Sequence, residues 1–310
     1  MKTRISVSLC ALAAGLCLFA AVVRTDGRSS TKPTKVLVRS KFVPGRVMRY
    51  KLKLRGSSAW APVEKGFGWG KMDTEFTFDL ATKVIRERGL CTFHLSGQNL
   101  MSSASGPKGR LGIVADRKKS RLKIGDAWQA PSSRTPLAKP MTLTQGPLGG
   151  VRFTTGMAPI ALYVIPRVDM RFWGLLTAAP LVKVAPGDEW SEEFKWRVPD
   201  SRGNPLKLSG RWKVLGYQHH RGRRVLALAL AVKMDLKNTQ VMLRNGDLAY
   251  VHSGSYAAQG KAMWDVSRGV LCYANAEQKV LIRAEKPKVR ALRSEHKCTL
   301  ELISFKERAQ

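Results

Sequence analysis

One short stretch decides the fold of this chain: Met48-Arg49-Tyr50-Lys51-Leu52-Lys53-Leu54-Arg55. Its apolar and basic side chains alternate with a period of two, which is the period of a β-strand. A helix would scatter the same residues around its axis. The stretch therefore predicts a strand with an apolar face in the core and a basic face in water.

Similar patterns recur along most of the chain and predict a mainly β, antiparallel protein. Further strands are expected around Phe76–Leu80 and Cys91–Leu95, in a hairpin of Leu206–Gly216 and Val225–Met234, and in a closing meander of Ala262–Asp265, Val270–Ala274, Lys279–Ala284 and Cys298–Phe305. The turn of the hairpin is expected at His219–Arg223. Val225–Leu230 is apolar on both faces, as in a central strand. Only Ile160–Ile165 and Phe172–Ala179 favour short helices.

Two turn signals recur in the same order and indicate an internal repeat. Phe42-Val43-Pro44-Gly45 opens one strand-rich block, and Val184-Ala185-Pro186-Gly187 opens another 142 residues later. Within each block a strand ends in an aspartate before a short turn, at Asp116 and again at Asp265, 149 residues apart. Chance recurrence of such turns in a β protein is the alternative. The repeat predicts a first half at 36–175 and a second half at 176–310.

A family resemblance rests on these turns and a few neighbouring segments. The Pro-Gly-opened strand Phe42–Leu54, Gly149–Phe153, Pro180–Trp190 and Gly260–Asp265 resemble a family of exported bacterial β proteins of unknown function, common in bacteria such as planctomycetes. The resemblance implies an envelope or periplasmic setting and a duplicated, strongly curved sheet, similar to the half-barrels of lipoprotein carriers. It implies no catalytic residues. The chain departs from the family in its strong basicity and in lacking a lipobox.

The N-terminus has the pattern of an export or membrane-insertion signal. Lys2 and Arg4 precede an uncharged run, Ile5–Val23, that is long enough to span a bilayer as a helix. The run is longer than most cleaved signals, and the sites near its end suit cleavage poorly, so a cleaved signal and an uncleaved anchor both stay open. We expect a signal or anchor at 1–24, a polar linker at 25–35, and the remainder in the periplasm or on the outer face of the inner membrane.

The charge is strongly positive, with 54 Lys and Arg against 22 Asp and Glu, a net charge of +32. Such a field attracts polyanions and anionic membrane surfaces. The nearest approach to a cluster is Lys108–Lys123, so we expect polyanion contact at Lys108, Arg110, Arg117, Lys118, Lys119, Arg121 and Lys123. A solvated surface with no specific partner is the plainer explanation. The spread of charge, the export signal and the absence of a zinc-finger or RNA-binding signature argue against nucleic acid.

Motifs for catalysis, metal binding or a cofactor are absent from the sequence. The five histidines show no metal-ligand spacing, and His219-His220 lies beside arginines that disfavour a bound cation. Cys91 and His94 would face opposite sides of a strand. Cys272 and Cys298 are expected on the first and third strands of the meander, too far apart to bridge. We expect no enzyme, metal or cofactor.

Two functional hypotheses remain. In the first, the concave apolar face of a curved sheet binds a lipid or another hydrophobic ligand. In the second, the protein has a structural or interaction role and contacts anionic envelope polymers or a membrane surface through its basic face. Residues 5–23 would add a membrane attachment if they are not cleaved.

Overall fold

The computed structural model describes residues 34–61, 70–85, 90–106, 109–133, 135, 137–138, 140–146, 149–155, 183–196, 206–242, 248–286 and 290–307. These residues all belong to one compact unit, Thr34–Gln310. The predicted signal or anchor, most of the linker, and both predicted short helices lie outside the described residues. So does most of the predicted junction between the two halves.

All the regular elements of the described residues are strands. They are β1 (Val47–Ala61), β2 (Lys71–Ile85), β3 (Cys91–Gly106), β4 (Gly109–Asp116), β5 (Ser120–Ile124), β6 (Ala127–Trp128), β7 (Met141–Gly146), β8 (Gly149–Thr155), β9 (Glu189–Trp196), β10 (Leu206–His220), β11 (Arg223–Met242), β12 (Leu248–Asp265), β13 (Val270–Lys286) and β14 (Arg290–Lys306). The prediction of a mainly β protein is confirmed.

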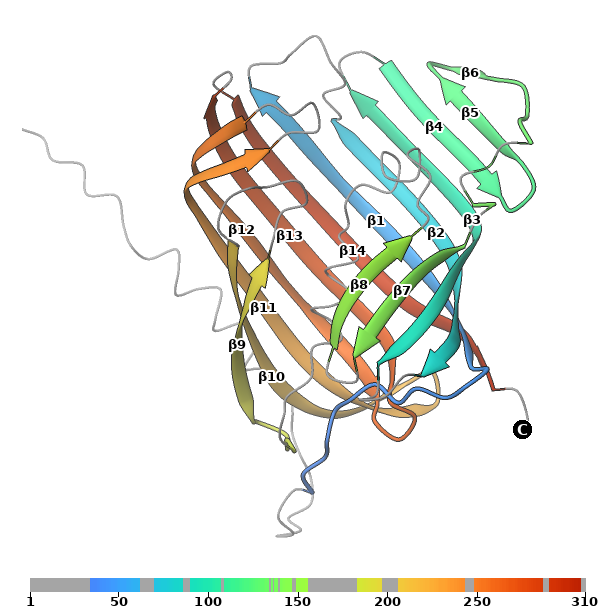
Figure 1. Cartoon of the computed structure of the whole chain (residues 1–310), viewed down its shortest axis with the longest axis vertical. Coiled ribbons are helices and arrows are strands. Elements are labelled where there is room, and N and C mark those ends of the chain that lie inside the picture. The colour runs from blue at the N-terminus through green and yellow to red at the C-terminus, as the bar shows by residue number, and fades with distance from the viewer. Residues whose placement is uncertain are drawn as a thin grey trace, which may run out of the picture. The chain divides into compact units, whose positions relative to one another are not determined.

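The strands form one antiparallel sheet in the order β6-β5-β4-β3-β2-β1-β14-β13-β12-β11-β10-β9. Figure 1 shows this order running from green through blue to red and then to yellow. Among the described residues β6 and β9 end the path without pairing to each other, so the sheet is open there. The last strand, β14, therefore lies in the middle of the sheet, between β1 and β13.

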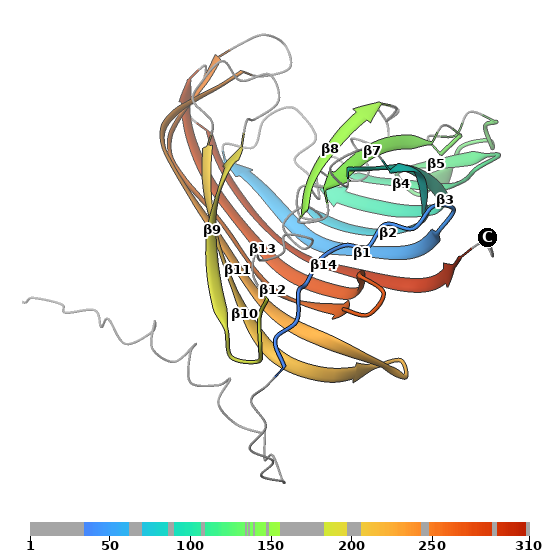
Figure 2. The ribbon, with the colours of Figure 1, turned by 60° about the horizontal axis from the view of Figure 1, so that its bottom comes forward.

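The strand β3 pairs with two different neighbours on the same side of the sheet path. Its first part, Cys91–Leu95, pairs with β7, while Asn99–Gly106 pairs with β4. The β7–β8 hairpin thereby leaves the plane of β4 and lies above the concave side of the curved sheet (Figure 2). The β7–β8 hairpin therefore covers part of the apolar, inward-facing side of the sheet.

The register of β1 is as predicted from its alternation. Met48, Tyr50, Leu52 and Leu54 are buried, and between them basic side chains point to the opposite face. Tyr50 stacks against Phe78 of β2, with ring centroids 5.8 Å apart. These side chains belong to a hydrophobic cluster that reaches along the sheet from β4 to β10. Burial of this apolar surface is the main force that holds the sheet in its curved form.

The basic face of β1 points to water, as predicted, but it is not a free surface. Carboxylates of β2 face the cations across the strand pair. The ion pairs are Arg49–Asp79 at 2.7 Å, Lys51–Glu75 at 2.5 Å, Lys53–Glu75 at 3.6 Å and Arg55–Asp73 at 2.9 Å. The positive field of the predicted strand is therefore largely neutralised by its neighbour.

Both Pro-Gly segments form the same kind of turn. In each, the residue after glycine donates its N–H to the carbonyl of the residue before proline: Arg46 to Val43 at 3.2 Å, and Asp188 to Ala185 at 3.0 Å. Gly45 and Gly187 have φ of 72° and 91°, which glycine adopts without strain. The turn predictions at these two sites are confirmed.

Two details of the predicted strands are wrong. Val270–Ala274 and Lys279–Ala284 are parts of one long strand, β13, because Ala276 and Gln278 continue the inward-facing alternation between them. Cys272 and Cys298 thus lie on neighbouring strands, where Cys298 pairs with Ala276 rather than Cys272, and both are free thiols.

The other wrong detail is the turn between β10 and β11. His219 and His220 continue β10, and the turn shrinks to Arg221-Gly222, with φ of 50° and 72°. Positive φ at both central residues is the geometry of a tight two-residue hairpin, in which glycine is favoured at the second position.

Residues 36–46, here called the strap, connect distant parts of the sheet before β1 begins. Val36 and Val184 exchange two backbone hydrogen bonds of 2.8 Å, which tie the strap to the segment that leads into β9. Lys41 donates its N–H to Gly269 in the β12–β13 turn at 3.1 Å. The strap therefore joins the start of the chain unit to its second half.

Candidate functional site

The β4–β5 hairpin brings together most of the predicted polyanion contacts. Asp116 ends β4, and its Oδ1 accepts the N–H groups of Lys118 and Lys119 at 2.7 and 2.9 Å. These backbone hydrogen bonds are the main cause of its lowered pKa. The aspartate thereby fixes the turn, as predicted from its position before a short loop. The side chains of residues 117–119 are exposed to solvent.

We call residues 109–124 the basic hairpin. It carries the predicted cations Arg110, Arg117, Lys118, Lys119, Arg121 and Lys123, whereas Lys108 lies outside the described residues. Arg110 is paired to Asp126 at 3.5 Å. Among the described residues no carboxylate lies within ion-pair distance of the other five cations. The hairpin therefore differs from β1, whose cations are neutralised.

Apolar side chains lie in register beside these cations on the outward face of the sheet. Met101 of β3, Val114 of β4 and Arg121 of β5 stand opposite one another in successive strand pairs. Lys123 of β5 stands opposite Trp128 of β6. We call these five residues the edge patch, since their strands, β3 to β6, form the β6 end of the sheet (Figure 1).

The indole of Trp128 lies close to both cations of β5. The guanidinium carbon of Arg121 is 5.3 Å from the ring centroid, and the ammonium of Lys123 is 6.0 Å from it. Both distances suit cation–π contact. These contacts keep the two cations and the ring together on one face, where the cations can still reach an external anion.

The apolar members of the edge patch are unusually exposed for their type. Met101 is 58% exposed, Val114 42% and Trp128 43%. Ile124, 54% exposed, adds an apolar side chain on the opposite face of the same edge. Sequence analysis found the cations but missed these side chains. Strict alternation from Cys91 would place Met101 inward, but an irregularity at Gln98 changes the phase of β3 and turns Met101 outward. Trp128 lies in a strand of two residues, too short to show a period.

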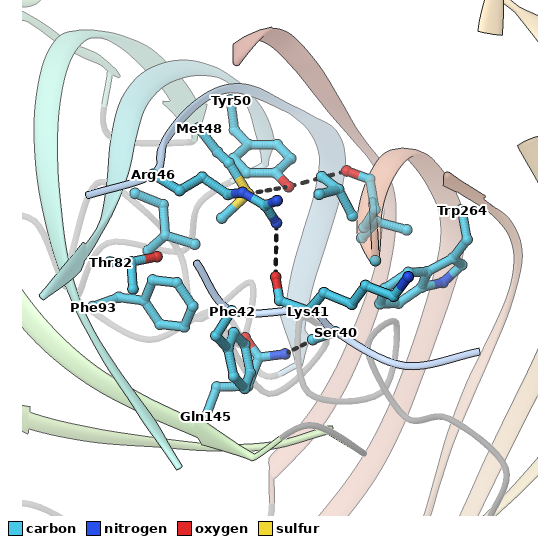
Figure 3. Close-up of a pocket in the computed structure, with 14 residues that line it drawn as sticks. Ser40, Lys41, Phe42, Arg46, Met48, Tyr50, Thr82, Phe93, Gln145 and Trp264 are labelled. Carbon is cyan, nitrogen blue, oxygen red and sulfur yellow. Dashed lines mark hydrogen bonds between the residues drawn. The ribbon is translucent and has the colours of Figure 1, made fainter. Parts of the chain in front are cut away.

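A second feature is a small cavity between the strap and the sheet (Figure 3). Its volume of about 20 Å³ has room for one water molecule. Aromatic and aliphatic side chains form most of its wall, among them Phe42 of the strap, Phe93 of β3 and Trp264 of β12. The buried indole Nε1 of Trp264 has no hydrogen-bond partner among the residues that the structure describes. With the strap in this position, the cavity is too small for an acyl chain.

Arg46, the last residue of the strap, lies beside this cavity. Its side chain is 5% exposed, and Nη1 donates to the carbonyls of Lys41 and Arg268 at 2.7 and 3.1 Å. Nη2 and Nε donate to Oε1 of Glu307 at 2.6 and 3.1 Å. A buried cation needs such a complete set of partners. Arg46 is therefore part of the fold's structure and not a free anion-binding group.

The other residues considered for chemistry remain apart. Cys91 is buried on the inner face of β3 and His94 lies three residues on, at a position facing the other side. His220 packs against Tyr273, with ring centroids 5.4 Å apart. Within the described ranges no group of three or more His, Cys, Asp or Glu side chains is arranged to hold a metal ion. Nor do those ranges contain a helix with the length and apolar character needed to cross a membrane.

The fold and the site together describe an open, all-antiparallel β protein with a basic, partly aromatic sheet edge. No family model matches the chain, and no curated protein matches it. The resemblance to exported bacterial β proteins therefore stays an expectation. A solved structure described as "Lipid-protein interactions in lipovitellin" is similar with a TM-score of 0.41 and 13% identity, over 87% of this chain and 26% of that one. The chain thus spans about a quarter of the length of that protein, and a TM-score of 0.41 does not support assigning it that protein's role.

Proposed function

We propose that this protein is a non-enzymatic binding protein that contacts anionic partners through the basic hairpin. The observation that supports this proposal is the contrast between two basic regions. The cations of β1 are paired to β2 carboxylates, whereas Arg117, Lys118, Lys119, Arg121 and Lys123 have no carboxylate partner among the described residues. Unpaired cations on a fixed hairpin can exchange their counterions for an anionic partner.

The test compares two triple variants that remove the same charge. The first is Arg117→Gln, Lys118→Gln, Lys119→Gln in the basic hairpin, and the second is Lys51→Gln, Lys53→Gln, Arg55→Gln in the paired region of β1. Binding of the full chain to heparin and to polyphosphate is measured in mild detergent over a salt titration.

Each exposed cation should contribute roughly 0.5–1 kcal/mol to the binding free energy. The hairpin variant, which lacks three of them, should therefore bind about 10- to 100-fold more weakly. The β1 variant should stay close to the wild type, because its cations are already neutralised. Equal losses in the two variants would show that only net charge matters and would refute the assignment to the hairpin.

We propose an exported location for this activity, at the periplasm or the outer face of the inner membrane. The support is the sequence of residues 1–24, with its basic head and apolar run. A reporter that is active only after export, fused behind Gln310, should be active. Activity of a cytoplasm-dependent reporter at the same position would contradict the proposal.

We also propose that the sheet is a duplicated half-barrel. The strand order β6-β5-β4-β3-β2-β1 is followed by β14-β13-β12-β11-β10-β9, so each half contributes six strands in the same spatial sequence. The matching turns at Gly45 and Gly187 support the same relationship. The hairpin β7–β8 is then an addition to the first half.

A second candidate function is the binding of a hydrophobic ligand on the concave face. The observation in its favour is the aromatic wall of the cavity under the strap, together with the unpartnered Nε1 of Trp264. Because the cavity holds about one water, a lipid could enter only after the strap moves. Native mass spectrometry of the purified protein tests this candidate: a bound lipid supports it, and ligand-free protein across membrane extracts counts against it.

A further inference from the structure

We infer that the partner of the basic hairpin is an anionic lipid bilayer, and that Met101, Val114 and Trp128 enter its interface. This inference rests on the proposed function and names the class of partner. A soluble polyanion needs only the cations. A bilayer surface offers both phosphate groups and an apolar region, and the edge patch presents both kinds of side chain in one register.

The first argument is the mixture of side chains. Met101, Val114 and Trp128 leave 58%, 42% and 43% of their surface in water although an inward-facing core is close by. Exposed apolar side chains that cluster within a polar rim mark interaction sites more often than isolated ones do. Their inward neighbours hold these residues outward: Leu100, Ile113 and Ala115 are buried, and a shift by one would expose them and bury Met101 and Val114 instead.

The second argument is the geometry around Trp128. Tryptophan prefers the headgroup level of a bilayer, where its ring is partly apolar and its N–H can be hydrated. Arg121 and Lys123 lie against its ring at 5.3 and 6.0 Å, so both cations would meet lipid phosphates at the depth where the indole rests. Long basic side chains with apolar stems suit this position, because the stem can follow the ring while the charge stays in water.

The third argument is the local charge. The acidic groups around the edge patch are all engaged: Asp116 binds the turn backbone, Asp126 pairs with Arg110, and Glu75, opposite Met101, pairs with Lys51 and Lys53. Asp116 keeps its negative charge, but Arg117, Lys118, Lys119, Arg121 and Lys123 outnumber it on the same hairpin. Charge complementarity with an anionic surface therefore extends over the whole patch.

The test measures whether the edge patch enters the interface. A polarity-sensitive dye is attached at Met101→Cys in the full chain, with Cys10 and Cys17 changed to Ala. The other three thiols stay unlabelled, because Cys91, Cys272 and Cys298 are buried and burial raises the pKa of Cys91 and Cys298 to about 12. The protein is reconstituted into vesicles of phosphatidylglycerol or of phosphatidylcholine.

The expected result is a blue shift of the dye in phosphatidylglycerol vesicles and none in phosphatidylcholine. High salt, or the double change Arg121→Gln, Lys123→Gln, should reduce the shift. The matched control is the same dye at Leu281→Cys. Leu281 is an equally exposed apolar residue, 55% exposed, opposite Arg293, which is already paired to Glu295. The dye there should not shift.

The outcomes separate the two proposals. If the dye at position 101 stays unshifted while the hairpin triple variant still loses heparin binding, the bilayer assignment is wrong and the partner is a soluble polyanion. If that triple variant binds heparin as the wild type does, the proposed function itself is wrong. A shift at position 281 equal to that at 101 also overturns the inference, since insertion would then not be specific to the edge patch.

Discussion

Arg46 and Glu307 lie 261 residues apart in the sequence, yet two guanidinium nitrogens of Arg46 donate to one carboxylate oxygen of Glu307. The pair joins the strap to the residue that follows β14. It also lies over the ring of Phe305, whose centroid is 4.8 Å from the guanidinium carbon. A buried cation of the strap thus reinforces the pairing of β1 with β14 at the end of these strands.

Replacing this cation should destabilise the protein strongly. Arg46→Met removes the donors to the carbonyls of Lys41 and Arg268 from part-buried hydrogen bonds and breaks the pair with Glu307, so we expect a loss of about 2–4 kcal/mol in the free energy of unfolding. The control is Arg55→Met, whose ion pair with Asp73 is exposed and should contribute less than about 1 kcal/mol. Thermal unfolding followed by circular dichroism measures both, and equal effects would contradict the structural role of Arg46.

The two faces of β1 should respond oppositely to charge. Leu52 is 7% exposed and lies between Phe76 and Leu300, so Leu52→Asp places an unpaired charge in the core and should cost several kcal/mol, about 3 or more. Lys53→Glu, next to Glu75 on the exposed face, should cost no more than about 1 kcal/mol. Chemical denaturation distinguishes them, and a tolerated Leu52→Asp would mean that the register is reversed.

Two turn glycines should differ in their tolerance of alanine. Gly222 and Gly269 both have positive φ, 72° and 61°. A Cβ at Gly222 meets open space, so Gly222→Ala should cost only about 1 kcal/mol of backbone strain. At Gly269 the Cβ would lie 2.4 Å from the backbone nitrogen of Lys41 in the strap. Gly269→Ala should therefore cost clearly more, and equal melting temperatures for the two variants would show that the strap does not press on this turn.

Acid should weaken the fold through His296. Burial lowers the pKa of His296 below its usual value near 6.5, so the unfolded chain binds its proton more readily than the folded one. Stability is then greatest above the unfolded pKa and falls as the pH drops below about 6.5 towards the lowered folded pKa. Melting temperatures between pH 7.5 and 5 should fall less in His296→Gln than in the wild type, with His219→Gln as the control. An equal fall in melting temperature in all three proteins would show that His296 does not cause the loss of stability in acid.

The fold could be predicted where a strand has one buried face. The alternation of Met48–Leu54 determines its register, and the structure confirms it, because any shift would bury cations. The length of β13 could not be predicted: Ala276 and Gln278 face inward with weak hydrophobicity, and they hold their places through the pairing with β12 and β14. Such residues are specified by their neighbours and not by their own propensity.

The site could be predicted only in part, for a similar reason. Charge density singled out the basic hairpin, but it did not separate free cations from paired ones. The carboxylates that neutralise β1 lie on β2, and only the register of the two strands brings Asp79 to Arg49. Trp128 joins the edge patch through its pairing with Lys123, a contact that leaves no periodic signal in a two-residue strand.

The central position of β14 bears on how the chain reaches this structure. Because residues 290–306 follow all the other described strands in the sequence, β1 and β13 have no partner on one side until these residues are made. Pairing of β1 with β14 then closes a loop that spans nearly the whole unit, a long-range step of the kind that slows folding. A chain that stops before Arg290 would keep two long, unpaired edges in the middle of its apolar face, where another copy could add its own strands. By covering both edges, β14 thus protects the protein from its own aggregation.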